Sequence, residues 1–507
     1  MALRSLPGDG DGAPESADRE IPNGDPRLAH GVLSTLDVIA VSVTLIAPGM
    51  TMLLNLPGIA AVAGGSTPLA FLIGGAACLA LAFVVVGFTR RMATAGYAYT
   101  YVSRTLGKSA GFVAGWLYGF CMLCAIPMAM AAAAFLLTDL LHLSTHWWFP
   151  LFVAGMALLV ALSVARIRIA TRLLLVVGTA VVIIILIVNI AVTAKGGAHG
   201  NTLQPFTFAH TNRGGFSGVF YGIILAVSSF LGFETAADFG EETSMPRRSV
   251  PTAVIVSVLF AIVLYLWTAY TLTIGFGVSA GTVFGADPFA LKTIADEYLG
   301  HGFGTLVEVG GVLSAFFLCV GCMTAGTRTL HAMSREGALP AWLGRINSRS
   351  RTPANASVSL AAVATVLAAA VGFGLGSDNL GGQPTTVYYF FATLGTLCIV
   401  MVFIGLCVGS VIFFRRTRPR YNLFLHAVIP VIGVAIFCAA LYGSVYPSPV
   451  YPINLTPYLA HIWLMIGIIV VAVLRNRRPG TVRRIGSIVG EEGPDLPRER
   501  VPWWLTR

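Results

Sequence analysis

The residues with chemistry to offer gather in one apolar segment, Phe216 to Pro251. It begins as a run long enough to enter a bilayer, and polar residues then interrupt it: Ser228, Ser229, Gly232 and Glu234. A charge at the centre of a membrane helix costs roughly 2.5–3.5 kcal/mol, so such positions usually line a cavity or face a partner helix. The pattern therefore predicts that hydroxyls, a carboxylate and freed backbone groups bind a small molecule inside a membrane, as in a transporter.

A second apolar stretch carries an interruption at Ala47-Pro48-Gly49-Met50-Thr51. Proline lacks an amide hydrogen and crowds the preceding turn, so the helical hydrogen bonds fail there. A short unwound segment would present the amides of Gly49, Met50 and Thr51, and a half-helix N-terminus favours an anionic group. An ordinary proline kink is the alternative. Two interruptions five helices apart are typical of inverted-repeat transporters and favour the binding interpretation.

Composition and length indicate the elements that must hold these interruptions. The chain has 507 residues, of which 56% are hydrophobic and 11% charged, against about 25% charged residues in soluble domains. A soluble globular protein is thereby excluded. Twelve stretches have the roughly 20 residues that a helix needs to cross a bilayer. They lie near 36–60, 67–89, 109–138, 147–165, 173–194, 216–238, 250–276, 303–327, 355–376, 386–414, 423–443 and 457–474.

The basic residues predict how these stretches are oriented. With the N-terminus in the cytoplasm, the inner segments hold 29 lysines and arginines, and the outer segments hold Lys195, Arg213 and Lys292. This bias predicts a multi-pass protein of the cytoplasmic membrane with both termini cytoplasmic. It also explains the net charge of +10 as topology and attraction to anionic lipid. We therefore expect the lipid bilayer, and no nucleic acid, as a partner; the oligomeric state stays open.

The chain divides into three parts. Residues 1–34 are polar and predict a disordered cytoplasmic tail. Residues 35–475 predict a twelve-helix transporter domain, with one repeat over 36–194, a second over 216–414 and two extra helices over 423–474. Residues 476–507 predict a cytoplasmic C-terminal tail.

Catalysis is not indicated. The closest approach to a phosphate-binding loop, Gly107-Lys108-Ser109, has Val102 where the motif needs its first glycine, so transport is expected to be secondary. No histidine or carboxylate cluster has the spacing of metal ligands, and no Ser–His–Asp set can share one cavity. The two CxxC pairs, Cys121–Cys124 and Cys319–Cys322, lack further ligands and are interpreted as packing residues. We expect no catalytic residue, no metal and no cofactor.

Three stretches resemble the amino acid–polyamine–organocation (APC) permeases, of the bacterial amino-acid permease type. They are AGYAYTYVSRTLGKSAGFVAGW (Ala95 to Trp116), FLGFETAADFGEETSMPRRSVPTAV (Phe230 to Val254) and TRTLHAMSREGALPAWLGRINSRSRTPANA (Thr327 to Ala356). The resemblance implies an all-α integral membrane protein with twelve transmembrane helices, arranged as a LeuT-like 5+5 inverted repeat plus two extra helices.

The resemblance also implies where a substrate sits. Its carboxylate would lie near Gly49–Thr51, and its amino group would meet carbonyls around Ser228–Leu231. Exposed amides attract an anion and free carbonyls attract a cation, so a zwitterionic amino acid fits between them. The expected substrate-binding residues are Ala47, Gly49, Met50, Thr51, Ser228, Ser229, Phe230, Leu231 and Gly232.

Two departures from the family pattern leave alternatives open. Ala47-Pro48-Gly49 replaces a Gly-Ser/Ala-Gly pattern and loses one donor, so an amine or another small organic molecule is an alternative substrate. Ser228 stands where many relatives have an aromatic gate. Gating is then expected at Tyr388, Tyr389 and Phe390, or a bulkier substrate is admitted; core packing is the alternative for these aromatic residues.

Glu234 is the candidate for proton coupling, because a desolvated carboxylate can take up a proton. A structural acceptor that braces its helix is the alternative role, and Glu308 is the second candidate. At the inner end, Glu241 and Arg247 are gate candidates, with a solvated charged rim as the alternative.

Together these features predict a secondary active transporter that moves an amino acid or related amine by alternating access, with proton coupling. An exchanger, or a membrane sensor that uses the same pocket without net transport, is the alternative.

Overall fold

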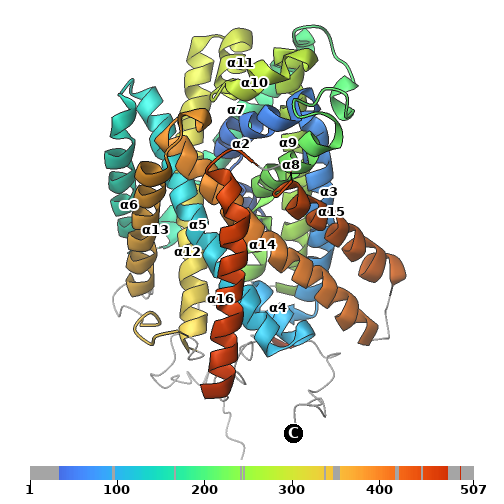
Figure 1. The fold of residues 1–507 in the computed structure, drawn as a ribbon, viewed down its shortest axis with the longest axis vertical. Coiled ribbons are helices and arrows are strands. Elements are labelled where there is room, and N and C mark those ends of the chain that lie inside the picture. The colour runs from blue at the N-terminus through green and yellow to red at the C-terminus, as the bar shows by residue number, and fades with distance from the viewer. Residues whose placement is uncertain are drawn as a thin grey trace, which may run out of the picture.

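The fold is a bundle of long helices (Figure 1). The computed structural model describes residues 34–93, 97–164, 167–239, 243, 246–335, 339–345, 354–416, 422–446, 449–477 and 491–492. Its α-helices are α1 (Thr35–Leu45), α2 (Pro48–Ala63), α3 (Thr67–Thr89), α4 (Tyr97–Leu106), α5 (Lys108–Leu140), α6 (Trp148–Val164), α7 (Ile167–Lys195), α8 (Gly215–Phe230), α9 (Pro246–Phe276), α10 (Gly281–Ala286), α11 (Ala290–Leu299), α12 (His301–Arg335), α13 (Ala354–Leu375), α14 (Gln383–Arg416), α15 (Ile429–Gly443) and α16 (Thr456–Arg477).

Short elements join these helices. The 3₁₀ turns are η1 (Gly64–Ser66), η2 (Thr145–Trp147), η3 (Gln204–Phe206), η4 (Phe233–Phe239), η5 (Val278–Ala280), η6 (Asp378–Leu380) and η9 (Ile453–Leu455), and η8 (Phe424–Val428) is a π-helical turn. Two strands, β1 (Met92–Ala93) and β2 (Glu491–Glu492), form one antiparallel pair. Turns and loops make up the rest of the described part of the chain.

Eleven segments of the described residues are long and apolar enough to cross a membrane. Ten of the expected stretches each correspond to one segment. The first segment, Thr35–Thr89, covers both 36–60 and 67–89 in 55 residues. At 1.5 Å per residue it holds about 80 Å of helix, whereas the hydrocarbon core is about 30 Å thick. One crossing therefore does not account for it, but a count of twelve still depends on dividing it at η1 and stays a prediction.

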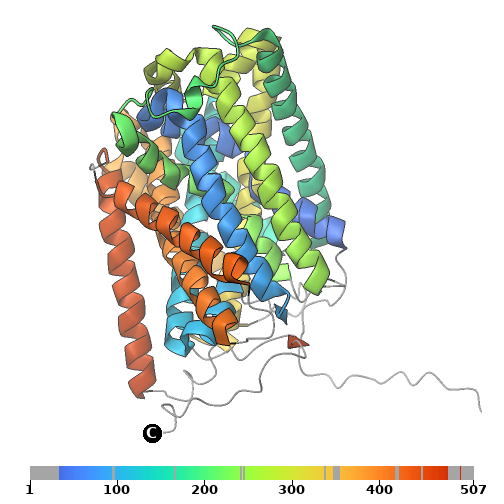
Figure 2. The same ribbon diagram turned by 90° about the vertical axis from the view of Figure 1, so that its right-hand side faces the viewer.

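The centre of the bundle is built around α5, which packs along both α12 and α14. Polar side chains join helices within the apolar interior: the Asn189 amide on α7 donates to the Thr268 hydroxyl on α9 at 2.9 Å, and the Thr271 hydroxyl donates back to Asn189 at 2.9 Å. By contrast α16 stands along one side of the bundle (Figure 2), with Ile462 and Ile469 exposed. Such an apolar outer surface suits contact with lipid.

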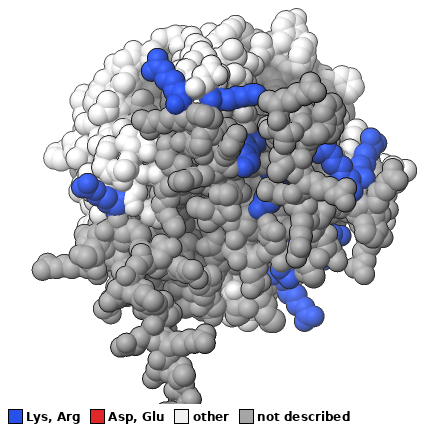
Figure 3. Space-filling model, turned by 90° about the horizontal axis from the view of Figure 1, so that it is seen from below, with Lys and Arg blue, Asp and Glu red and all other residues white. Residues whose placement is uncertain are grey.

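The two ends of the bundle differ in charge. We call the lower end of Figure 1, with α4 and the last residues of α3, α14 and α16, the basic end. Seen from below, the described charged side chains in view are lysines and arginines (Figure 3). The opposite end carries α10 and α11 (Figure 1). Lys292 is part of α11, and Lys195 donates to the Tyr298 carbonyl of α11. The Arg213 amide donates to the Val62 carbonyl near the end of α2, where α10 packs. This separation agrees with the predicted alternation of loops.

Candidate functional site

The first half of the site is the break between α1 and α2. Helix α1 ends at Leu45, and Ala47 adopts the left-handed region, with φ 52°. Pro48 begins α2 and has no amide hydrogen with which to continue α1. The Ile46 carbonyl between the two helices accepts the Tyr265 hydroxyl of α9 at 3.0 Å. The helix thus breaks where the sequence predicted an interruption.

The beginning of α2 offers backbone amides toward the site. The first amides of a helix have no acceptor within it, and no side chain caps α2. Because Pro48 has none, the available amides are those of Gly49 and Met50. The amide of Thr51 instead donates to the Ala47 carbonyl at 3.0 Å, so the expectation of a free amide at Thr51 was wrong. A residue at the fourth helical position already reaches the first carbonyl of the helix.

The second half of the site is the break after α8. Helix α8 ends at Phe230, Leu231 is extended, and Gly232 has φ 119° before η4 begins. This conformation is open to glycine and strained for other residues. The Glu234 side chain stabilises the turn, because its Oε2 accepts the Gly232 amide at 2.9 Å.

The two breaks lie against each other. A Cβ added at Gly232 would stand 2.6 Å from the Leu45 carbonyl oxygen and 2.9 Å from the Ile46 amide nitrogen. The close approach therefore requires glycine. It brings the end of α1 and the end of α8 to the same depth in the bundle.

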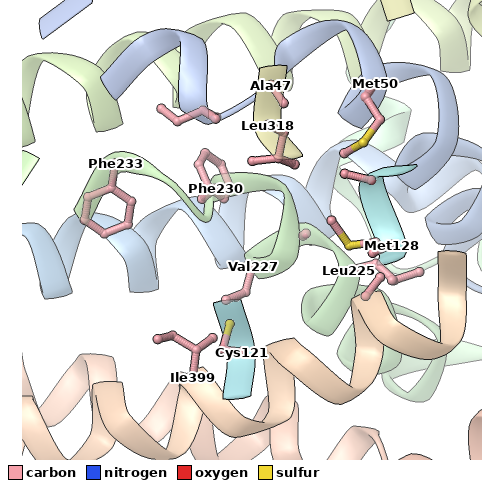
Figure 4. Close-up of a cluster of buried hydrophobic side chains, with 14 of the residues drawn as sticks. Ala47, Met50, Cys121, Met128, Leu225, Val227, Phe230, Phe233, Leu318 and Ile399 are labelled. Carbon is pink, nitrogen blue, oxygen red and sulfur yellow. The ribbon is translucent and has the colours of Figure 1, made fainter. Parts of the chain in front are cut away.

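A cavity opens beside the crossing breaks, and the empty space of about 630 Å³ there includes space open to solvent. One wall is apolar and comes from α5, α12 and α14, with Met128, Leu318 and Phe391. Figure 4 shows Met50 and Met128 directed into the space between the α2 and α5 ribbons, with Leu318 beside them. Polar groups come from Thr51, Asn55, Ser228, Thr235 and Thr396. Among the described residues that line the cavity, none is charged.

Five of the predicted substrate-binding residues line this cavity: Met50, Thr51, Ser228, Leu231 and Gly232. The other four are buried around it. Phe230 packs against Tyr265, with ring centroids 5.5 Å apart. The Ser229 hydroxyl donates to the Leu225 carbonyl at 2.8 Å. Ala47 has no exposed surface, and a Cβ added at Gly49 would stand 2.8 Å from Val181 of α7.

Glu234 is fully buried and does not line the cavity. One carboxylate oxygen accepts the Gly232 amide, which is the bracing role weighed from the sequence. The other oxygen, Oε1, has no hydrogen-bond partner among the described residues. The geometry thus gives Glu234 a structural bond and one open acceptor, and proton coupling stays a prediction.

Two gate candidates join α14 to α2. The Tyr388 hydroxyl donates to Asn55 Oδ1 at 2.6 Å, and the Tyr389 hydroxyl donates to the Leu54 carbonyl at 2.8 Å. Phe390 is buried away from the cavity and packs edge-on against Phe391. Of the inner candidates, Arg247 begins α9 near the basic end, and Glu241 lies outside the described residues.

Sequence reasoning missed Asn55. Its side-chain amide donates to the Ser229 hydroxyl at 2.9 Å, so one residue joins α2, α8 and α14 above the cavity. A lone amide between Leu54 and Leu56 in an apolar stretch was the available signal. The apolar wall gave no such signal, because Met128, Leu318 and Phe391 resemble any other residue of a membrane helix.

Comparison with known proteins decides the family. The profile of the amino acid permease family matches residues 38–479. The chain belongs to the amino acid permease family. It is 27% identical over 499 residues to a branched-chain amino acid permease, BcaP, of Lactococcus lactis subsp. cremoris, covering 91% of this chain and 98% of that protein. It is 24% identical to the BcaP of Bacillus subtilis, over 81% of this chain and 86% of that one.

The relatives extend beyond amino acids. A methylthioribose transporter of Bacillus subtilis is 22% identical, over 75% of this chain and 81% of its own length. The resemblance to the APC permeases is confirmed, and the chain is a multi-pass membrane protein of a transporter family. Family membership by itself does not determine the substrate of this chain. The substrate must therefore be inferred from the residues that line the cavity.

Proposed function

We propose that this permease is a secondary active transporter that moves a neutral, apolar amino acid across the cytoplasmic membrane by alternating access, with proton coupling. The observation that carries the proposal is the contact of the two helix breaks beside an uncharged cavity.

The backbone supplies complementary charge for a zwitterion. The amides of Gly49 and Met50 stand at the positive end of α2, and the last carbonyls of α8 stand at the negative end of that helix. An α-carboxylate fits the first and an α-ammonium fits the second. Because the breaks touch, both poles lie within the span of one small molecule.

The wall of the cavity selects the side chain. Met128, Leu318 and Phe391 offer apolar contact, and a cationic or acidic side chain would lose its hydration without a charged partner among the described lining residues. The two BcaP relatives are named for branched-chain amino acids. Isoleucine, leucine and valine are therefore the first substrates to test.

The transport cycle is proposed from the same contacts. Tyr388 and Tyr389 close the α10–α11 side of the cavity through Asn55 and Leu54, and Glu234 carries the coupled proton. The architecture we propose is the twelve-helix, LeuT-like arrangement, with α15 and α16 as the two extra helices and both termini cytoplasmic.

Uptake of radiolabelled isoleucine into proteoliposomes tests the proposal. Accumulation that rises with an inward proton gradient is expected. Unlabelled lysine, which carries a cationic side chain, should compete weakly. Uptake that needs isoleucine on the other side and ignores the proton gradient would replace symport by exchange. Binding without uptake or exchange would make the protein a sensor and would overturn the proposed transport.

A further inference from the structure

A cluster of charged residues lies far from the helix breaks, at the α10–α11 end. The ammonium of Lys292 on α11 contacts Asp139 Oδ2 at the end of α5 at 2.6 Å, and Glu308 Oε2 near the start of α12 at 2.7 Å. The proposed binding site uses none of these residues. Through them one lysine joins three helices.

The charges in this cluster do not balance. Two carboxylates share one ammonium, so one negative charge remains when both are ionised. The Glu308 side chain is 1% exposed, and its Oε1 has no hydrogen-bond partner among the described residues. An uncompensated buried carboxylate is strongly unfavourable. The Asp139 side chain, 37% exposed, gives the cluster a path to solvent.

Among the described residues, Lys292 is the cation that contacts both carboxylates. Burial lowers the pKa of Lys292, but its hydrogen bonds to Asp139 and Glu308 outweigh burial and raise this pKa above its usual value, so Lys292 stays charged. The exposed His142 follows α5, and its backbone amide donates to the Asp139 carbonyl at 2.9 Å. Asp296 of α11 accepts the Gly304 amide and faces the exposed His301.

The other helices that pack on α11 add no counter-charge to the cluster. Lys195 of α7 is directed to the Tyr298 carbonyl at 2.7 Å. Helix α2 has no titratable side chain, and α9 offers the Tyr270 hydroxyl, which accepts the Thr202 amide. A proton shared by the two carboxyls would neutralise the cluster.

The helix that Lys292 holds is part of a cover over α2. A Cβ added at Gly285 of α10 would stand 2.4 Å from the Ala61 backbone, so α10 rests directly on the outer end of α2. Phe289, just before α11, stacks on Phe135 of α5 with ring centroids 5.0 Å apart. Because α2 carries one of the two helix breaks, movement of this cover and movement of α2 are mechanically linked.

We propose that Asp139, Glu308 and Lys292 form a proton-binding latch: one proton bound between the carboxyls holds α11 closed over α2, and its loss favours opening. The sign follows from linkage. The closed cluster binds the proton more tightly than the open, hydrated one, so protonation stabilises closure. This stabilisation is present at low pH and is lost as pH rises. The latch goes beyond the proposed transport, because it regulates access from the α10–α11 end.

Hydrogen–deuterium exchange of the full-length protein tests the latch without any transport assay. Protection of the α11 amides is measured at about pH 5.5 and about pH 8, with exchange times scaled for the intrinsic rate. We expect the protection factor to fall about tenfold at the higher pH, because the closed form then loses the proton that stabilises it. Peptides from α13 serve as an internal control.

Variants separate the latch from simple packing. Glu308→Gln and Asp139→Asn each remove one negative charge, so α11 should stay protected at both pH values. Lys195→Met is the matched control, because it removes a lysine that holds α11 through the carbonyl and the ring of Tyr298. Protection of α11 in this variant should fall by the same factor at both pH values. A wild-type protein without the pH effect would overturn the latch. The latch would also be overturned if the Glu308→Gln and Asp139→Asn variants kept the pH dependence of α11 protection, or if the Lys195→Met variant lost it. Failure of isoleucine uptake alone would refute the proposed function and leave this result standing.

Discussion

Two buried glutamates among the described residues of this permease differ in their electrostatic surroundings. Glu234 lies beside the crossing helix breaks, has no exposed surface, and accepts one backbone amide. Glu308 lies at the α10–α11 end and pairs with Lys292, which also pairs with the partly exposed Asp139. The first region has an uncharged cavity beside two helix ends, where we propose that the substrate binds, whereas the second is held by formal charges. The comparison suggests that substrate binding and control of access are separated along the bundle.

The largest effect is expected at the contact between the breaks. Gly232→Ala should lower isoleucine uptake at least about 100-fold, because the new Cβ would meet the Leu45 carbonyl at 2.6 Å and alanine is strained at φ 119°. Gly405→Ala is the control, since a Cβ there meets nothing within 4 Å. Initial rates in proteoliposomes decide the comparison, with size-exclusion profiles to establish folding. Near-normal uptake by Gly232→Ala would show that the close crossing is not needed.

The next largest effect is expected when Glu234 and Glu308 are replaced separately, because only one of the two replacements should abolish stimulation by a proton gradient. Glu234→Gln keeps an oxygen to accept the Gly232 amide, so it should fold and still exchange isoleucine, while stimulation by a proton gradient is lost. Glu308→Gln should keep that stimulation. Gradient-driven uptake and counterflow measured on the same vesicles check both. If the Glu234→Gln variant responded to the proton gradient as the wild type does, Glu234 would not be the residue that couples transport to protons.

Lys292→Met should then destabilise the protein by about 1–3 kcal/mol at neutral pH, because it leaves two carboxylates near each other without a cation; the exposure of Asp139 keeps the loss below that of a fully buried pair. Stability should recover as pH falls and the carboxyls take up protons. Thermal unfolding at several pH values measures this, with Lys195→Met expected to lose under about 1 kcal/mol at every pH. If Lys292→Met and Lys195→Met lost the same stability at every pH, the stabilising role of the Lys292 charge would be contradicted.

The smallest effect is expected at the hydrogen bond between Tyr388 and Asn55. Tyr388→Phe removes the hydrogen bond to Asn55, worth about 1 kcal/mol, and should make Cys322 in the cavity react several-fold faster with a thiol reagent. Tyr458→Phe, at an exposed position on α16, is the control. Unchanged reactivity of Cys322 would indicate that this hydrogen bond does not restrict access.

Local chemistry explains how much the sequence could predict. Pro48 indicated the first helix break, and the polar residues Ser228, Ser229, Gly232 and Glu234 within an apolar run indicated the second. Proline alone was not sufficient evidence, because Pro57, Pro127 and Pro251 lie inside helices. Apolar length placed the helices, except that the stretch from Thr35 to Thr89 forms one continuous segment by hydropathy. The sequence did not predict where α2 begins, and therefore did not show that the Thr51 amide donates to the Ala47 carbonyl.

The remaining features depend on distant parts of the chain. Lys292 was counted only as an outer charge and Glu308 only as a second proton candidate, and nothing local indicates that they meet each other and Asp139. The apolar wall of Met128, Leu318 and Phe391 comes from three helices whose registers are set by packing. These are properties of the assembled bundle, and no single stretch encodes them.

Alkylation of the native cysteines tests the central claim most directly. Cys121 and Cys322 line the cavity, whereas Cys438 is exposed on α15. Mass spectrometry of the purified protein should show that isoleucine slows alkylation of Cys121 and Cys322, that lysine does not, and that Cys438 reacts equally throughout. Unaltered alkylation of both cavity cysteines, under conditions in which isoleucine is transported, would place the substrate elsewhere and contradict the account.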